Sequence, residues 1–265
     1  MFADSVANGQ SSHVSAGNSS IARHRDRVHV GTSGWSYRSW RGPFYPPSES
    51  PREDLAFYAR HFSTAEVNNT FYRLPSIETV RSWRDTVPAD FIFAIKASRY
   101  ITHMKRLSDP EQPLALLFER IQPLGDRLGP ILFQCPPRWH KNVDRLGAFL
   151  QHLPRDHRYA FEFRDPTWFD REVYDLLSAH QVALCMYDLA GQRSPMVMTT
   201  DMVYVRFHRP ARDDTWAYDR DALVKLAEDI TFWVNDGRSV YCYFNNDPGG
   251  AAPRNAQELL ELLSP

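Results

Sequence analysis

The chain has 265 residues, 43% of them hydrophobic, and its 31 basic and 32 acidic side chains give a net charge of −1 at pH 7. This length suits one α/β barrel or two small domains, each with a buried core. The balanced charge argues against a protein generally covered by nucleic acid or bound to a membrane surface, although it is compatible with a local basic patch. Cys135, Cys185 and Cys242 lie in separate apolar runs without metal-ligand spacing, which is typical of buried free thiols in a reducing cytoplasm.

Residues 1–26 are rich in Ser, Asn, Ala and His and contain no apolar segment of the kind that signal peptides have. We interpret them as a disordered N-terminal extension. Residues 27–265 are expected to form one domain, because no linker or change of composition divides them. No segment approaches the ~18–20 uninterrupted apolar residues that a membrane helix needs, so we expect a soluble cytoplasmic protein with no membrane partner.

Short apolar runs alternate with helical patterns along this domain. Strands are expected at residues 28–33, 64–72, 91–98, 130–135, 159–164, 183–188, 203–208 and 239–246. Helices are expected at 52–61, 76–84, from 111, at 143–152, 165–180, up to 235 and at 255–263. Eight strand-then-helix units in one chain of this length predict a single (β/α)8 TIM barrel, an α/β fold; an open, doubly wound sheet is the alternative.

The clearest alternation of large apolar and polar residues is at 159–164, with the sequence Tyr-Ala-Phe-Glu-Phe-Arg. If its two phenylalanines face the covering helices, Glu162 and Arg164 face the barrel interior, where they must be paired, solvated or used. Arg206 and His208 share one face of the seventh strand in the same way. The sequence therefore predicts a polar site inside one end of the barrel.

The same alternation, applied to every strand, gives a ring of polar residues near the carboxyl ends, where TIM barrels place their active sites. The ring consists of Ser33, Glu66, Asn68, Lys96, Ser98, Gln134, Glu162, Arg164, Asp188, Arg206, His208 and Asn245. A purely structural barrel would fill its interior with Val, Ile and Leu, so we interpret the ring as a functional site. The alternative is a buried ion pair that only stiffens the barrel.

The bases of this ring favour an anionic ligand group, such as a phosphate or a carboxylate. Glu162 beside cations should stay ionised, and His208 could exchange protons near neutral pH. The predicted catalytic residues are Glu162, His208, Lys96 and Asp188. The predicted substrate-binding residues are Ser33, Trp35, Glu66, Asn68, Arg164, Arg206, Asn245 and Asn246. We expect an enzyme acting on a phosphorylated or sugar-containing substrate; hydrolysis, isomerisation and lyase chemistry are all compatible with these residues.

No cofactor can be named from the sequence. A divalent metal on Glu66, Glu162, Asp188 and His208 is an alternative that the residues do not favour, because barrel zinc sites have more histidines and the nearby cations compete for the carboxylates. A Schiff base at Lys96 is a further alternative. No Walker loop, Rossmann glycine pattern, nucleophile elbow or zinc-finger spacing occurs.

Two loops at the same end could recognise a larger partner. The first interleaves aromatic residues with arginines over residues 34–47, and the third is basic over residues 99–106. Such loops stack on sugars or bases while arginines hold phosphate, or they simply cap the barrel. Nucleic-acid binding or processing is therefore an alternative function, and a non-catalytic ligand-binding barrel is another. The oligomeric state cannot be inferred from the sequence.

Several motifs spread over residues 28–263 carry a resemblance to a known family. They include Gly31-Thr32-Ser33-Gly34-Trp35, Glu66-Val67-Asn68-Asn69-Thr70-Phe71-Tyr72, Phe133-Gln134-Cys135-Pro136-Pro137, Glu162-Phe163-Arg164, Tyr204-Val205-Arg206-Phe207-His208 and Tyr243-Phe244-Asn245-Asn246-Asp247. On these motifs the chain resembles the YecE-like family, whose members are TIM barrels classed as a domain of unknown function. The resemblance implies a TIM barrel and no established reaction.

Such barrels are distantly similar to DNA-repair enzymes of the endonuclease IV type, but the histidine-rich metal cluster of those enzymes has no match here. The chain also departs from the family at Arg209-Pro210, where glycine is expected after the histidine of the seventh strand. This departure predicts a loop conformation and a substrate preference of its own.

Overall fold

The structure is a computed structural model, and it describes residues 27–48, 50–211 and 216–264. The N-terminal extension at 1–26, with its predicted disorder, lies outside the described residues. No helix in the described ranges is both long enough and apolar enough to cross a membrane.

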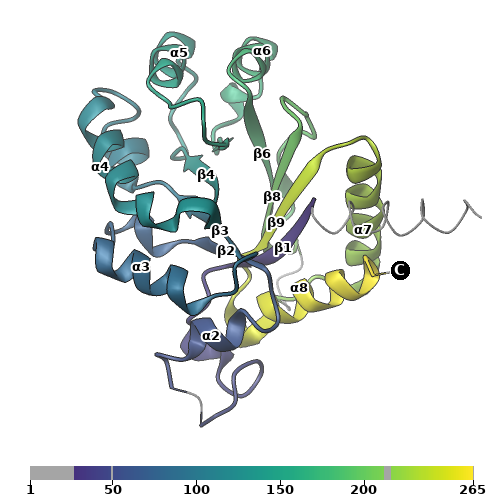
Figure 1. Cartoon of the computed structure of the whole chain (residues 1–265). Coiled ribbons are helices and arrows are strands. Elements are labelled where there is room, and N and C mark those ends of the chain that lie inside the picture. Colours follow the sequence, from purple (N-terminus) through teal and green to yellow (C-terminus); the bar gives the residue numbers. More distant parts are fainter. Residues whose placement is uncertain (1–26, 49, 212–215, 265) are drawn as a thin grey trace, which may run out of the picture.

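Eight parallel strands form a closed barrel (Figure 1). They are β1 (Val28–Ser33), β2 (Thr64–Val67), β3 (Ile92–Lys96), β4 (Leu128–Gln134), β5 (Tyr159–Glu162), β6 (Val182–Leu189), β8 (Met202–Arg209) and β9 (Ser239–Phe244). Each pairs in parallel with the next along the chain, and β9 pairs with β1 to close the ring. The predicted TIM barrel is confirmed, and the open sheet is excluded.

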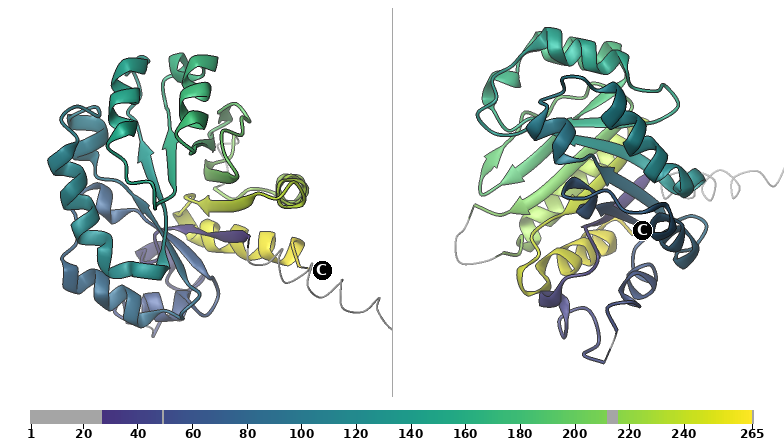
Figure 2. Two further views of the ribbon diagram at one scale, coloured as in Figure 1. Left: turned by 45° about the horizontal axis from the view of Figure 1, so that its top comes forward. Right: turned by 90° about the vertical axis from the view of Figure 1, so that its left-hand side faces the viewer.

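Helices cover the outside of the barrel (Figure 2). They are α2 (Asp54–Tyr58), α3 (Ile77–Thr86), α4 (Glu111–Ile121), α5 (Val143–Gln151), α6 (Arg171–Ala179), α7 (Arg220–Asn235) and α8 (Ala251–Leu262). Several begin at a side chain that accepts a hydrogen bond from a backbone N–H of the first turn, as Ser76 does for α3 and Asp219 does for α7. Ser76 could be recognised as a cap from the sequence. The helix expected from residue 165 begins instead at Arg171, after the separate 3-10 turn Pro166–Trp168, and the last helix begins at Ala251 and not at 255.

The connection after β6 differs from the predicted strand-then-helix unit. A short strand, β7 (Gln192–Arg193), turns back to pair antiparallel with β6, and an extended segment runs on to β8 without a helix. Ala190 and Gly191 adopt positive φ angles of 53° and 81° to make this turn. One of the eight predicted units therefore has a hairpin in place of its helix.

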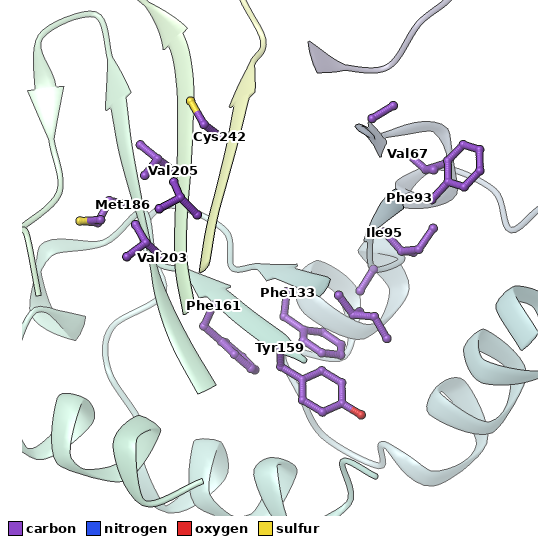
Figure 3. Close-up of a cluster of buried hydrophobic side chains, with 14 of the residues drawn as sticks. Val67, Phe93, Ile95, Phe133, Tyr159, Phe161, Met186, Val203, Val205 and Cys242 are labelled. Carbon is purple, nitrogen blue, oxygen red and sulfur yellow. The ribbon is translucent and has the colours of Figure 1, made fainter. Parts of the chain in front are cut away.

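The barrel has two apolar cores. The outer core lies between the strands and the helices; Figure 3 shows part of it, with Phe133, Tyr159 and Phe161 pointing from their strands toward the helices. The inner core fills the barrel interior and consists of Ala94, Leu132, Ala160, Ala183, Cys185, Met202, Tyr204, Tyr241 and Tyr243. Because the inner residues alternate with the outer ones, the next inward positions along several strands are the polar ones that the sequence singles out.

Candidate functional site

The inner core ends in a set of buried charges toward the carboxyl ends of the strands. We call Glu66, Lys96, Glu162, Arg164 and Arg206 the charged layer. Arg206 lies at its centre, with Nη2 2.8 Å from Glu66 Oε1 and Nη1 2.7 Å from Glu162 Oε2. The side chains of all three are fully buried. The strands β2, β5 and β8 thus bring together residues 140 positions apart in the sequence.

Glu66 is held by hydrogen bonds as well as by Arg206. Its carboxylate accepts from the Ser33 hydroxyl and, at 2.7 Å, from the Tyr204 hydroxyl. Burial would raise the pKa of Glu66, but Arg206 and Lys96 outweigh burial and lower it. Tyr204 was not predicted as a site residue, although the alternation of β8 places it on the same face as Arg206 and could have revealed it.

Glu162 is held even more strongly. It accepts from Arg164 Nε at 2.5 Å in addition to Arg206, and the Cys185 thiol lies 3.6 Å away. Burial would raise its pKa, yet the guanidiniums of Arg206 and Arg164 hold the pKa well below its usual value. Glu162 is therefore ionised near neutral pH, as predicted. A carboxylate with so low a pKa takes up a proton poorly, so it is a weak general base.

His208 has both ring nitrogens engaged. Its Nε2 lies 2.6 Å from Arg164 Nη2 and 3.3 Å from Arg206 Nη1, and its Nδ1 lies 2.8 Å from the Asn245 side-chain amide. Because a guanidinium can only donate, Nε2 must accept and the ring proton belongs on Nδ1. The Asn245 amide must then turn so that its Oδ1, and not its Nδ2, faces Nδ1 and accepts this proton. Burial and the neighbouring Arg206 lower the pKa of His208 to about 4. The imidazole is thus neutral at pH 7, which differs from the expectation that it titrates there.

Lys96 is the member of the charged layer that lacks an anionic partner. Its ammonium lies 4.3 Å from the centre of the Phe71 ring, and no hydrogen bond or ion pair joins it to any residue in the described part of the chain. Its side chain reaches the surface only slightly, with 7% of the residue exposed. Burial, and then Arg206, lower its pKa to about 8. Three cations therefore face two carboxylates, which leaves one positive charge at the mouth when Lys96 is protonated.

The structure places Asp188 differently from the prediction. Asp188 lies on the outward face of β6 with Met186, where it accepts from Arg193 Nε at 2.8 Å and from the Gly191 N–H at 3.2 Å. The inward residue is Tyr187, whose ring packs 4.3 Å beneath the guanidinium of Arg164. The prediction that Asp188 joins the polar ring is wrong, because β6 is apolar on both faces and its alternation could not be inferred from the sequence.

Asn246 is also directed away from the charged layer. It is fully buried and donates to the Trp216 carbonyl at 2.7 Å and to Asn255 Oδ1 at 2.9 Å. Asn246 therefore joins the loop before α7 to α8, whereas its neighbour Asn245 faces His208. The prediction that Asn246 lies among the substrate-binding residues is wrong. Strand β9 ends at Phe244, so the alternation of inward and outward side chains does not continue to Asn246.

Trp35 and Asn68 lie beside the charged layer, in a pocket of about 550 Å³ at the same rim. Asp247 also lines this pocket and was not predicted. Burial raises the pKa of Asp247 to about 7, although Arg206 opposes the change. The only sequence signal for Asp247 is its position in the motif that follows β9.

The aromatic first loop packs mainly on itself. Trp40 and Tyr45 are fully buried, and Arg41 pairs with Asp54 and lies 4.8 Å over the Tyr45 ring. The Trp40 indole donates to the Asp247 carbonyl at 3.1 Å. The loop was expected either to stack on sugars or bases or to cap the barrel. The packing of these residues supports the cap.

Among residues 27–48, 50–211 and 216–264, no group of three or more His, Cys, Asp or Glu side chains is arranged to hold a metal ion.

Comparison with known proteins gives relatives along nearly the whole chain. UPF0759 protein YunF of Bacillus subtilis is 26% identical over 270 residues, which cover 89% of this chain and 94% of YunF. UPF0759 protein YecE of Escherichia coli K12 is 31% identical over 143 residues, or 54% of this chain and 50% of YecE.

Solved structures have the same fold. The crystal structure of a DUF72 family protein from Thermotoga maritima has a TM-score of 0.79 and 30% identity, with 89% of this chain and 98% of that chain covered. One from Enterococcus faecalis has a TM-score of 0.75 and 21% identity, with 89% and 95% covered. The family model described as "Protein of unknown function DUF72" matches residues 29–265. The chain therefore belongs to the DUF72 family, to which the YecE-like motifs also pointed.

Proposed function

We propose that this protein is an enzyme that binds a small anionic molecule, phosphorylated or sugar-containing, at the carboxyl end of the barrel. The observation that carries the proposal is the ammonium of Lys96, which is largely buried at the mouth and has no anionic partner among the described residues. An anion placed there would neutralise the excess positive charge of the charged layer.

Lys96 is also the residue to which we assign proton transfer. A group with a pKa of about 8 exists in both protonation states near neutral pH, which general acid–base catalysis requires. Glu162 and Glu66 then position the guanidiniums, because both carboxylates are already committed to Arg206. His208 fixes Arg164 through Nε2 and does not transfer the proton. This division of roles is compatible with a hydrolase and with an isomerase or lyase.

The test is isothermal titration calorimetry of the full chain with sulfate, whose charge is constant over the pH range used. We expect the affinity to fall as the pH rises through about 8, because Lys96 then loses its proton. Lys96→Ala should weaken binding about tenfold or more and remove this pH dependence. Lys225→Ala, at a lysine on α7 with a 72% exposed side chain, is the matched control and should change nothing.

The contrary results are equally clear. Sulfate binding that survives Lys96→Ala, or a native chain that binds neither sulfate nor phosphate, would overturn the anion site.

A further inference from the structure

The pocket beside the charged layer is formed by helix α3 and by the loops after β1, β2 and β9. These three strands are neighbours in the barrel (Figure 1). We call it the ring pocket. The lining residues that matter here are Trp35, Tyr37, Asn68, Tyr72, Trp83 and Asp247. Its volume of about 550 Å³ lies within the range of sites that bind small molecules.

Aromatic side chains form the apolar part of the ring pocket. Trp35 meets Trp83 edge to face, with ring centres 5.4 Å apart. Tyr72 also lines the pocket and is 70% exposed, which is unusual for so large an apolar ring. Aromatic faces of this kind pack against the carbon-bound hydrogens of a flat or puckered ring while leaving its polar substituents free.

The polar part of the ring pocket consists of acceptors that lack donors. Asn68 Oδ1 and Asp247 Oδ1 are buried, and neither has a hydrogen-bond partner in the described part of the chain. The Tyr37 hydroxyl lies close enough to interact with both Asn68 and Asp247, but it donates its one proton to the Ser33 carbonyl at 2.6 Å and so cannot donate to either of them. A buried acceptor without a donor is destabilising, so a ligand that supplies donors would satisfy both residues.

The charge next to the ring pocket limits what that ligand can be. Asp247 interacts with both Arg206 and Glu66, which places the pocket against the charged layer and its excess positive charge. While Asp247 is protonated, an ammonium group would be repelled by that charge. Hydroxyl groups supply the missing donors without any charge, and they can also accept a hydrogen bond from the carboxylic acid form of Asp247.

We propose that the ring pocket binds the hydroxyl-bearing ring of the same ligand whose anionic group binds at Lys96, so that the ligand is an acidic sugar. This inference rests on the proposed function, since it takes the anion site as given. Either a phosphate or a carboxylate group on the sugar could bind the ammonium of Lys96, and the experiment below distinguishes the two.

The experiment compares ligands that carry one or both parts. Glucose, inorganic phosphate, glucose 6-phosphate and glucuronate are titrated into the full chain by calorimetry. We expect one of the two acidic sugars to bind about tenfold more tightly than inorganic phosphate, because the ring adds contacts. A preference for glucose 6-phosphate identifies phosphate as the anion, and a preference for glucuronate identifies carboxylate.

Two variants remove ring contacts without disturbing the fold. Tyr72→Ala truncates an exposed side chain, and Asn68→Ala removes an amide that makes no capping hydrogen bond to the 3-10 turn it precedes. Each should reduce the advantage of the acidic sugar to about threefold or less and leave inorganic phosphate within about twofold of the native affinity. Phe232→Ala, at a 69% exposed ring on α7, is the matched control and should alter neither.

Each other outcome has one meaning. If phosphate binds but neither acidic sugar binds more tightly, or if Tyr72→Ala weakens phosphate and sugar equally, the ring pocket is not a sugar subsite and the anion site stands. If no anion binds the native chain, both proposals fail together.

Discussion

The charged layer and the ring pocket lie side by side at one end of the barrel, but they differ in how their polar groups are partnered. In the charged layer, Arg206 pairs with two carboxylates through Nη1 and Nη2, and these three side chains are fully buried; only its Nε lacks a hydrogen-bond partner among the described residues. In the ring pocket, two buried acceptors have no donor within the described residues. Paired charges such as those of Arg206, Glu66 and Glu162 stabilise the fold, whereas unpartnered acceptors in an open pocket can be satisfied by a ligand that enters it.

One carboxyl group from each region shows the same contrast. Two guanidiniums keep the pKa of Glu162 well below its usual value, while burial raises the pKa of Asp247 to about 7. Environments that push two acids apart in this way divide their roles. Glu162 is a fixed charge that positions Arg164 and Arg206, and Asp247 can change its protonation state near neutral pH.

The largest effect should come from Arg206→Ala. The substitution leaves Glu66 and Glu162 buried without their central partner, so the free energy of unfolding should fall by roughly 3–5 kcal/mol, measured by urea denaturation. A triple variant, Arg206→Met with Glu66→Gln and Glu162→Gln, removes all three charges and should recover much of the loss. A single variant as stable as the native chain would show that the charges are solvated and not buried.

A smaller effect should appear in how His208 changes stability with pH. Its pKa is about 4 in the folded chain and near 6.5 when exposed, so the native state binds fewer protons in this window. The contribution of His208 is therefore complete above pH 6.5 and is lost as the pH falls toward 4. Between pH 7 and 4.5 the native chain should lose about 2 kcal/mol that His208→Gln does not lose.

The difference between the two chains cancels the contribution of the other histidines. Equal losses of stability in the native chain and in His208→Gln would mean that water reaches the imidazole and that its pKa is not lowered.

Asp247 should show the opposite sign. Its pKa of about 7 is raised from 3.8, so its contribution is complete below pH 3.8 and is lost as the pH rises through 7. Asp247→Asn, which mimics the neutral acid, should gain about 1 kcal/mol relative to the native chain between pH 5 and 8, a value reduced because water can enter the pocket. Thermal unfolding of both chains at the two pH values measures this gain. If Asp247→Asn instead lost stability relative to the native chain, the raised pKa of Asp247 would be contradicted.

The sequence was informative where a strand has one apolar and one polar face. Alternation on β5 and β8 located Glu162, Arg164, Arg206 and His208 correctly on the inner face, and the eight apolar runs predicted the barrel. It failed where a strand is apolar on both faces, as in β6, because nothing then marks the inward side. Asp247 could not be found either, since its environment comes from loops that are distant in the sequence.

The smallest effect should come from Asp188→Asn. This substitution tests whether Asp188 really faces outward from β6, the strand whose inward face could not be predicted. Asp188 lies outside the barrel and pairs with Arg193, whose side chain is 71% exposed. Asparagine keeps an oxygen that can accept from the Gly191 N–H and loses only this partly solvated ion pair, so stability should change by less than about 1 kcal/mol. Anion affinity should stay within about twofold of the native value, because no side-chain hydrogen bond or ion pair joins Asp188 to Lys96 or Arg206 in the described chain. Arg193→Ala, which removes the other partner of the same ion pair, should behave alike.

A large loss of anion affinity in Asp188→Asn alone would mean that β6 presents this carboxylate to the ligand, and that the inward position of Tyr187 changes on binding.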